Sequence, residues 1–549
     1  MAVGHRLSIH AFTGILTACM ALILTACAGG SSNSAPPPPP PAATGPVWQQ
    51  GVFEPSDKYA NKCETPRTGI NPATNQPYPD VKGSELEEKF WQRSYSNETY
   101  LWYNEIQDRD PATGGDRLAY FDTLKTTATT ASGNPKDKFH FTEDTAKVQQ
   151  RISSGASAGY GIHYAIIARR PPRKILVAFV EPNSPAADQG VARGAEILEV
   201  DGVDAVNDSS QAGVDKLNAG LFPDAAGESH SFKILDPGST TPRTITMTSA
   251  IVTEVPVNIL KTLDVGGNKV GYLHLSTFFT SSTEQGLFDA FTTLANTGIS
   301  DLIVDLRYNG GGFLDISSEM AFMIAGQAQT GGKTFETLQY NDKHTTTDIN
   351  GNPITPTPFY NTARGFSVPR GTALPSVNLN RVFILTTSGT CSASEALING
   401  LRGIDVEVVL IGTLTCGKPY GFIPPDNCGI TYFTLQFKGV NDKGFGDYTD
   451  GFAAQNAADG VGELIPGCEV SDDFTHALGD PAETQLATAI SYIQTGSCPT
   501  SARPFAQKLH AERSLHADDP ASLFSNPRVR NAWLLRHSLL AGGPQRGEE

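Results

Sequence analysis

The chain has 549 residues, enough for about three or four domains. Its 57 Asp and Glu outnumber its 41 Lys and Arg, which gives a net charge of −16 at pH 7. This acidic balance argues against a nucleic-acid-binding protein, because phosphate contacts need clustered Lys and Arg. Hydrophobic residues make up 39% of the chain, which is sufficient for packed cores. The only long apolar stretch lies at the N-terminus, which excludes a polytopic membrane protein.

Residues 1–27 have the layout of an export signal: a short basic region, then an apolar segment that ends at Cys27 in the motif LTAC. This ending resembles a bacterial lipobox, which implies that Cys27 is acylated and begins the mature protein. The alternatives are a plain secretory signal cut near Ala26 or a buried apolar helix. Six prolines at 36–41 argue against the helix and predict an extended tether over 28–50.

Export would place the protein in an oxidising compartment. Beyond Cys19 and Cys27, six cysteines remain, so up to three disulfides are expected among positions 63, 391, 416, 428, 468 and 498. The first pair expected is Cys416 with Cys428, which flank a Pro-Pro-Asp turn. A metal site is the alternative, but no Cys-x-x-Cys or His-x-x-x-His spacing supports one. No metal or organic cofactor is therefore expected.

Aromatic and apolar positions recur at helical spacing between 85 and 103, which predicts a small helical subdomain within 51–147. Near the C-terminal end of the predicted core, the pattern of residues 471–490 predicts a helix that ends this core. The remaining segment, 498–549, is a tail of mixed charge to which no function is assigned.

Residues 148–252 predict a unit of short strands. An alternating run at 175–180 is followed by a Ser-Pro-Ala turn, a helix-sized gap, a strand that ends in Asp-Gly and a final strand at 243–247. This order resembles a PDZ domain, which adds a peptide as an extra strand and holds its terminal carboxylate with backbone N–H groups. The resemblance implies that this carboxylate loop consists of Gly159, Tyr160, Gly161 and Ile162.

The residues that carry out any catalysis are expected within 253–497. A glycine-rich turn, Gly310 to Gly312, follows the buried-strand pattern at 302–307. The turn lacks the Lys-Ser/Thr of a phosphate-binding loop and the spacing of a dinucleotide site. Two interpretations stay open: a sharp bend without a ligand, or a turn whose N–H groups point at a developing oxyanion.

Ser392 follows another predicted strand, 382–386, and begins a predicted helix. With Glu395 it has the spacing of a capping box, so this serine is either an ordinary helix cap or a nucleophile. Lys418 lies 26 residues further on (418 − 392), after the apolar run 408–411. Taken alone, such a lysine is usually a solvated surface charge.

Together these residues resemble the C-terminal processing, or tail-specific, peptidases, which are Ser–Lys enzymes with a PDZ domain. The resemblance implies that Ser392 is the nucleophile and Lys418 its general base. It also implies that the N–H groups of Ala393 and of a glycine, Gly310 or Gly311, form the oxyanion hole. The implied core is a ClpP/crotonase-like spiral of ββα units, and the fold class is α/β (α+β).

Lysine can act as a base only if burial lowers its pKa from about 10.4 towards neutrality. We expect the apolar run 408–411 to provide that burial. What orients the lysine stays open, because Phe422 stands where some relatives have a Gln. Glu395 and Tyr420 are the candidates for that role. Cys391 is a minor rival nucleophile, since no histidine lies in a matching motif.

The sequence thus predicts six segments: signal 1–27, tether 28–50, helical subdomain 51–147, PDZ domain 148–252, peptidase core 253–497 and tail 498–549. We expect an envelope serine endopeptidase that captures the C-terminal ends of proteins. Its lipid anchor would hold it at the outer membrane facing the periplasm, since Ala28 is not the Asp that retains such lipoproteins in the inner membrane. The alternative is a non-catalytic lipoprotein of the same fold that binds peptides or an apolar ligand.

Overall fold

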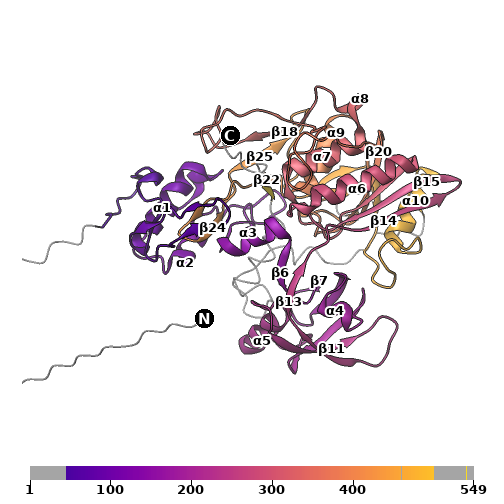
Figure 1. Cartoon of the computed structure of the whole chain (residues 1–549), viewed down its shortest axis with the longest axis horizontal. Coiled ribbons are helices and arrows are strands. Elements are labelled where there is room, and N and C mark those ends of the chain that lie inside the picture. Colours follow the sequence, from indigo (N-terminus) through magenta and orange to yellow (C-terminus); the bar gives the residue numbers. More distant parts are fainter. Residues whose placement is uncertain (1–44, 459, 500–538, 541–549) are drawn as a thin grey trace, which may run out of the picture. The chain divides into compact units, whose positions relative to one another are not determined.

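The computed structural model describes residues 45–458, 460–499 and 539–540 (Figure 1). The expected lipidation residue Cys27, most of the tether and most of the tail lie outside these residues. Within the described ranges, no helix is both long and apolar enough to span a bilayer. Helices and strands are mixed along the chain, so the predicted α/β fold class is confirmed.

A six-stranded sheet forms the centre of the C-terminal half. In spatial order its strands are β14 (Val257–Val265), β15 (Asn268–Leu275), β16 (Asp301–Asp305), β20 (Arg381–Thr386), β21 (Glu407–Gly412) and β28 (Gly467–Glu469). Strands β14 and β15 are antiparallel, and the rest of the sheet is parallel. The apolar runs in the sequence therefore predicted its central strands correctly, because parallel strands are buried on both faces.

Alternate residues of each strand face opposite layers of the core. Leu302 and Val304 of β16 pack in the larger apolar cluster, whereas Ile303 packs in the other one with residues of the last helix. The helices of the first layer are α6 (Ser282–Thr297), α7 (Leu314–Ala325) and α9 (Ala393–Gly403), which gather in Figure 1. The second layer contains α10 (Thr484–Thr495).

Shorter elements complete this half of the chain. They are β17 (Gly312–Phe313), α8 (Gln327–Thr330), β18 (Thr334–Gln339), β19 (Thr357–Pro358), β22 (Tyr420–Gly421), β23 (Asp426–Asn427), β24 (Ile430–Phe433), β25 (Phe437–Val440), β26 (Phe452–Ala454) and β27 (Glu463–Ile465). Strands β19, β18, β25 and β22 form a second sheet.

The expected closing helix over 471–490 is wrong in its first part, since α10 begins only at Thr484. Pro481 lacks the N–H that a helix interior needs. Glu483 is the helix cap, and its carboxylate accepts hydrogen bonds from the N–H groups of Gln485 and Leu486.

The strand-rich segment predicted over 148–252 forms a sheet with its own apolar core. Its strands follow the order β12 (Arg243–Thr248), β11 (Ser229–Leu235), β9 (Glu196–Val200), β8 (Lys174–Val180) and β7 (Ile162–Ala168), with β10 (Val203–Asp204) also on β9. Its helices are α4 (Pro185–Asp188) and α5 (Gln211–Leu221), and β6 (Ala156–Gly159) pairs with β13 (Ala250–Thr253). Strand β7 lies at one edge of the sheet.

The segment predicted as a helical subdomain, 51–147, contains α1 (Glu85–Thr99) and α2 (Arg117–Asp122), whereas α3 (Thr145–Ser154) begins at its end and continues past the predicted boundary. It is not purely helical, because it also has the short strands β1 (Lys62–Cys63), β2 (Ile70–Asn71), β3 (Gln76–Pro77), β4 (Val81–Lys82) and β5 (Phe141–Asp144). Strand β5 pairs with β24 of the C-terminal half. This pairing joins residues far apart in sequence, so periodicity within 51–147 did not reveal it.

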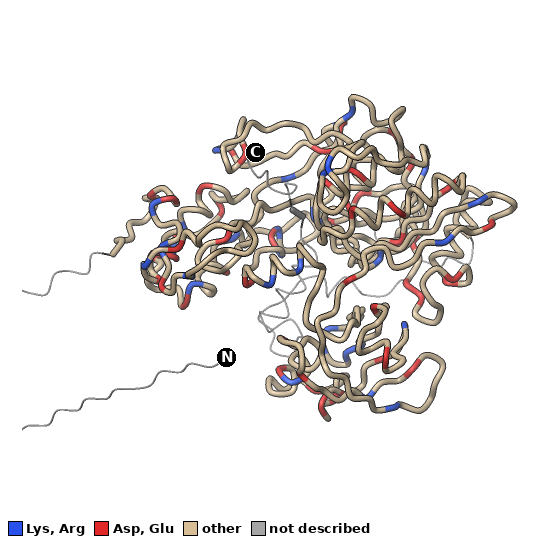
Figure 2. The backbone as a smooth tube through the Cα atoms, viewed as in Figure 1, with Lys and Arg blue, Asp and Glu red and all other residues tan. Residues whose placement is uncertain are grey.

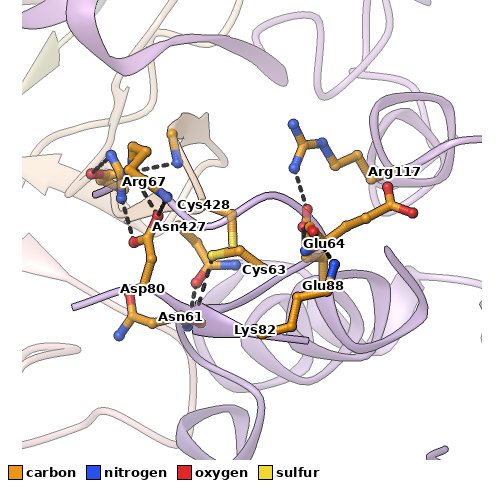
Figure 3. Close-up of a disulfide and its surroundings, with 12 residues drawn as sticks. Asn61, Cys63, Glu64, Arg67, Asp80, Lys82, Glu88, Arg117, Asn427 and Cys428 are labelled. Carbon is orange, nitrogen blue, oxygen red and sulfur yellow. Dashed lines mark hydrogen bonds and ion pairs between the residues drawn. A yellow bond between two sulfur atoms is a disulfide. The ribbon is translucent and has the colours of Figure 1, made fainter. Parts of the chain in front are cut away.

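The three disulfides are Cys63–Cys428, Cys391–Cys416 and Cys468–Cys498. The expected Cys416–Cys428 pair is therefore wrong. Figure 3 shows the Cys63–Cys428 disulfide and the residues around it. The neighbouring Asn427 side chain accepts a hydrogen bond from the N–H of Asn61 (2.8 Å), which brings the N-terminal segment to this turn.

Ion pairs strengthen the same junction (Figure 3). Arg67 bonds the carboxylate of Asp80 within the N-terminal segment and reaches Asp426 (2.7 Å) in the C-terminal half. Elsewhere, Lys and Arg are interspersed with Asp and Glu along the described chain rather than gathered in one run (Figure 2).

Candidate active site

Ser392 occupies a strained turn between β20 and α9. Its φ is +63° and its ψ −113°, a backbone conformation that costs a non-glycine residue about 1–3 kcal/mol. The side chain is fully buried, and its Oγ has no hydrogen-bond partner among the described residues. Ser392 and Glu395 have the capping-box arrangement that their spacing predicts, with the carboxylate of Glu395 accepting the N–H of Ser392 (2.9 Å). An ordinary N-cap serine has an extended backbone, so the positive φ of Ser392 is what sets it apart.

Lys418 is also buried, with 1% of its surface exposed. Its Nζ lies 4.2 Å from the ring centroid of Phe422 and 4.7 Å from that of Phe139. Burial lowers the pKa of Lys418 well below its ordinary value, although the charges of Asp137 and Glu395 oppose this shift. The residue is not a surface charge. The two aromatic rings, one from each half of the chain, contact the amine.

Glu395 brings these two residues together through their backbones. One carboxylate oxygen, Oε2, accepts the N–H of Ser392 (2.9 Å) and the N–H of Lys418 (2.8 Å). The other oxygen accepts the N–H of Gly417 (2.8 Å) and the hydroxyl of Thr415 (2.5 Å). Because both N–H groups bond the same oxygen, the backbone nitrogens of Ser392 and Lys418 cannot be farther apart than the sum of the Ser392 and Lys418 hydrogen-bond distances to Oε2. Glu395 anchors the main chain of Lys418.

The disulfide Cys391–Cys416 links the same two segments covalently. It joins the residue before Ser392 to the residue two before Lys418. Because both thiols are consumed, Cys391 is not a nucleophile in this oxidised state, and neither sulfur is a thiolate ligand for a metal.

The glycine-rich turn lies directly against the serine. Gly311 has a φ of +107°, and a Cβ built on it would stand 2.7 Å from Cβ of Ser392 and 2.9 Å from N of Ala393. The N–H of Gly311 donates to Oδ1 of Asn309 (2.9 Å), so in this structure it is not the oxyanion donor expected from the sequence. The N–H groups of Ala393 and Gly310 have no partner in the described part of the chain. These two amides are the available donors.

Asn309 was missed at the sequence level, although it directly precedes the glycines. Its carbonyl accepts the N–H of Cys391 (3.1 Å) and the hydroxyl of Ser394 (3.0 Å). Its side chain bonds Gly311 and also donates to the carbonyl of Leu275 (3.2 Å). Asn309 therefore holds the glycine turn against the turn that carries Ser392.

Asp137 was also missed, because it lies in the N-terminal segment far from both motifs. It accepts hydrogen bonds from the hydroxyl of Tyr100 (2.8 Å) and from the N–H of Phe139 (2.9 Å). Burial raises the pKa of this carboxyl, whereas the charge of Lys418 lowers it. The local sequence carries no signal that the carboxyl of Asp137 lies close enough to Lys418 to influence its pKa.

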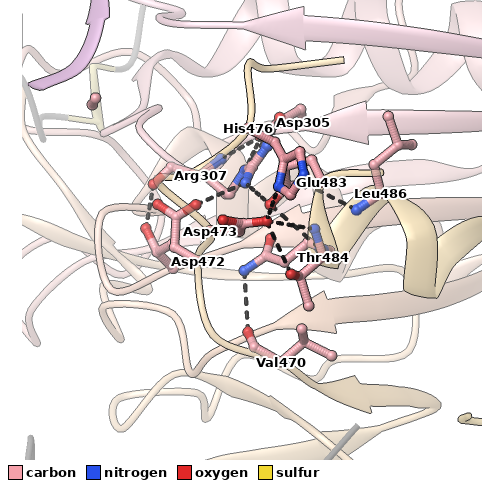
Figure 4. A network of polar contacts seen from close by, with 12 residues as sticks. Asp305, Arg307, Val470, Asp472, Asp473, His476, Glu483, Thr484 and Leu486 are labelled. Atoms are coloured by element: carbon pink, nitrogen blue, oxygen red, sulfur yellow. Dashed lines mark hydrogen bonds and ion pairs between the residues drawn. The ribbon is translucent and has the colours of Figure 1, made fainter. Parts of the chain in front are cut away.

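A buried ionic network supports the strand that leads into the glycine turn (Figure 4). Arg307 is fully buried and bonds Asp305 (2.6 Å), Asp472 (2.8 Å) and Glu483 (2.8 Å). Burial alone would raise the pKa of Asp305, but the guanidinium beside it holds that pKa below its usual range. From the strand-rich segment, Arg193 reaches the same Asp472 (2.7 Å).

The expected carboxylate loop follows β6. Gly161 has a φ of +77°, and a Cβ there would lie 2.3 Å from Cβ of Ser184. The carbonyl of Tyr160 accepts the N–H of Ala186 (3.0 Å), which fixes the loop against α4. The N–H groups of Tyr160 and Gly161 have no partner within the described residues. Beyond the loop, Ile162 begins the edge strand β7.

Part of this chain is similar to a known family of peptidases. Residues 269–421 match Peptidase family S41, a range that includes the glycine turn, Ser392 and Lys418. The matched range lies within the segment 253–497 that the sequence predicted as a peptidase core.

The curated relatives are processing proteases. The chain is 23% identical over 295 residues to the carboxyl-terminal-processing protease of Picosynechococcus sp., covering 52% of this chain and 61% of that protein. It is 30% identical over 150 residues to the carboxy-terminal processing protease CtpB of Bacillus subtilis, covering 27% and 29% of the two chains. The chain thus spans less than two thirds of the length of these relatives.

A solved structure has the same fold over most of this chain. A protein from Bacteroides fragilis NCTC 9343, classed as an S41 protease, superposes with a TM-score of 0.56 at 22% sequence identity. The superposition covers 76% of this chain and 98% of that protein.

Proposed function

We propose that the protein is a serine endopeptidase in which Ser392 is the nucleophile and Lys418 the general base. One observation carries the proposal: the amine of Lys418 is buried against two aromatic rings, and burial lowers its pKa. A neutral amine can take the proton of a serine hydroxyl, whereas an ammonium cannot. We assign the buried hydroxyl of Ser392, whose Oγ has no hydrogen-bond partner in the described chain, as the group that gives its proton to this base.

In the first step, Oγ of Ser392 bonds the carbonyl carbon of the scissile peptide while its proton passes to Lys418. The N–H groups of Ala393 and Gly310 stabilise the resulting oxyanion, and the N-terminus of α9 adds a favourable dipole. Lys418 then returns the proton to the leaving amine as the C–N bond breaks, which leaves an acyl-enzyme. Water then attacks this ester while one of its protons passes to Lys418. Lys418 returns the proton to Oγ of Ser392 as the ester bond breaks and the new carboxyl terminus leaves.

We further propose that 148–252 is a PDZ domain that selects substrates by their C-terminal ends. Two observations support this role. Strand β7 is an edge strand to which a peptide can add, and the N–H groups of Tyr160 and Gly161 are open to a terminal carboxylate.

The proposed location is the bacterial envelope, with the lipid anchor at Cys27 in the outer membrane and the body in the periplasm. The lipobox-like motif supports the anchor, and three disulfides suit an oxidising compartment. Mass spectrometry of the protein purified from membranes would test it: we expect a diacylglycerol-modified Cys27, which a Cys27→Ser variant would lack.

The activity is tested with the chain from residue 46 and an unfolded protein that has an apolar C-terminus, followed by intact mass. We expect cleavage by wild type and its loss in Ser392→Ala and Lys418→Met. The exposed residues Ser300 and Lys333 provide matched controls, and Ser300→Ala and Lys333→Met keep wild-type rates. Cleavage that survives both active-site changes contradicts the proposed dyad. Peptide binding without cleavage by any form would favour the non-catalytic lipoprotein.

A further inference from the structure

A short strand from the tail lies beside the candidate active site. This strand, β29 (Leu539–Leu540), pairs in parallel with β17, with Leu539 opposite Gly312 and Leu540 opposite Phe313. It also contacts β22. Strand β17 begins directly after Gly311, and β22 begins two residues after Lys418. The tail strand thus contacts the strands that follow the glycine turn and Lys418.

One edge of β17 is already occupied by another part of the core. The N–H of Phe278 donates to the carbonyl of Gly311 (2.8 Å), and the N–H of Phe313 donates to the carbonyl of Phe278 (3.0 Å). Alternate residues of a strand direct their peptide groups to opposite edges. The peptide groups of Gly312 therefore face the other edge, which is the edge that β29 occupies.

An edge strand beside a nucleophile is suited to hold an extended peptide main chain. Backbone hydrogen bonds provide the affinity, so recognition of this kind tolerates many sequences. Gly312 has a φ of +140°, which other residues rarely adopt, and a Cβ on it would lie 2.1 Å from the carbonyl carbon of Phe278, so a glycine is needed where β17 meets that backbone. The neighbouring Gly311 lies directly against Ser392.

We propose that β17 is the strand that holds the substrate main chain, and that the tail segment around Leu539 and Leu540 is an intramolecular competitor for it. This inference rests on the proposed peptidase function. A tethered segment has an effective concentration of about millimolar, so external substrates must displace it. The tail therefore restrains hydrolysis until a substrate of sufficient affinity takes its place.

A proline in β29 tests the inference in the chain from residue 46 to 549. Leu540→Pro removes a backbone donor and disfavours strand pairing, whereas Ala511→Pro places the same change elsewhere in the tail. We expect Leu540→Pro to lower the apparent KM for the unfolded substrate at least threefold, with kcat unchanged within about twofold. Ala511→Pro should behave as wild type. Equal KM values for the two variants would overturn the inference.

Binding separates this inference from the proposed chemistry. In a Ser392→Ala background, a labelled peptide from the substrate should bind the Leu540→Pro chain at least threefold more tightly than the Ala511→Pro chain. If no form hydrolyses the substrate but this difference appears, the peptidase proposal fails and the competing tail stands.

A third measurement does not depend on folding of the proline variants. A synthetic peptide of residues 533–545 should inhibit wild-type hydrolysis competitively, and in Ser392→Ala it should displace the labelled peptide. A peptide that does neither contradicts the inference.

Discussion

Gly311 offers the sharpest test of the proposed site. The structure predicts that Gly311→Ala disrupts it by contact as well as by backbone strain. A Cβ at this position would lie 2.7 Å from Cβ of Ser392 and 2.9 Å from both N of Ala393 and O of Cys391. Backbone atoms cannot rotate away from such a group, so the turn or the serine must shift.

Gly227 is a matched control for the strain alone. Its φ is +95°, close to the +107° of Gly311, but a Cβ there would meet nothing within 4 Å. Each alanine costs about 1–2 kcal/mol for the left-handed backbone. The Gly311 variant adds an overpacking cost of about 1–3 kcal/mol, so its free energy of unfolding should lie below that of Gly227→Ala by this amount.

The effect on hydrolysis should be larger than the effect on stability. The added methyl group would lie beside the Ala393 N–H, and losing one oxyanion donor typically lowers the rate by about 10²–10³-fold. Urea unfolding and initial rates of substrate cleavage measure the two quantities. Equal unfolding free energies and equal kcat/KM values for the two variants would refute the reasoning.

Three further outcomes follow from the structure. Lys418→Met should abolish hydrolysis yet raise the free energy of unfolding. Because the pKa of Lys418 is lowered in the folded state, the gain in unfolding free energy is largest at acidic pH and vanishes towards the ordinary lysine pKa of 10.5. Urea unfolding across pH would measure it. Glu319 is buried beside Glu284, and its pKa is raised to about 9, so stability should fall by up to about 1.4 kcal/mol per pH unit between pH 4.5 and 9. Glu319→Gln should flatten that decline, and an unchanged slope would contradict it. Asn309→Ala removes the bonds that hold the glycine turn and should lower kcat at least tenfold with little change in KM; a change confined to KM would show that the turn binds rather than activates.

The sequence by itself determined the elements of the core and the candidate residues. Alternation and apolar runs are local signals, so they located β15, β16, β20 and β21. The motifs around Ser392 and Lys418 also lie in short stretches of chain, and they singled out residues that the structure brings together at Glu395.

Tertiary structure alone decided what those residues can do. The rings beside Lys418 come from Phe139 and Phe422, which are far apart in sequence, so its lowered pKa has no local signature. The sequence spacing identifies Glu395 as part of a capping box, and the structure has that box. Only the fold makes the same carboxylate the anchor of the segment that carries Lys418. Disulfide pairing and strand pairing likewise depend on distances in space. Neither can be read from spacing along the chain, because folding brings distant segments together while separating near ones.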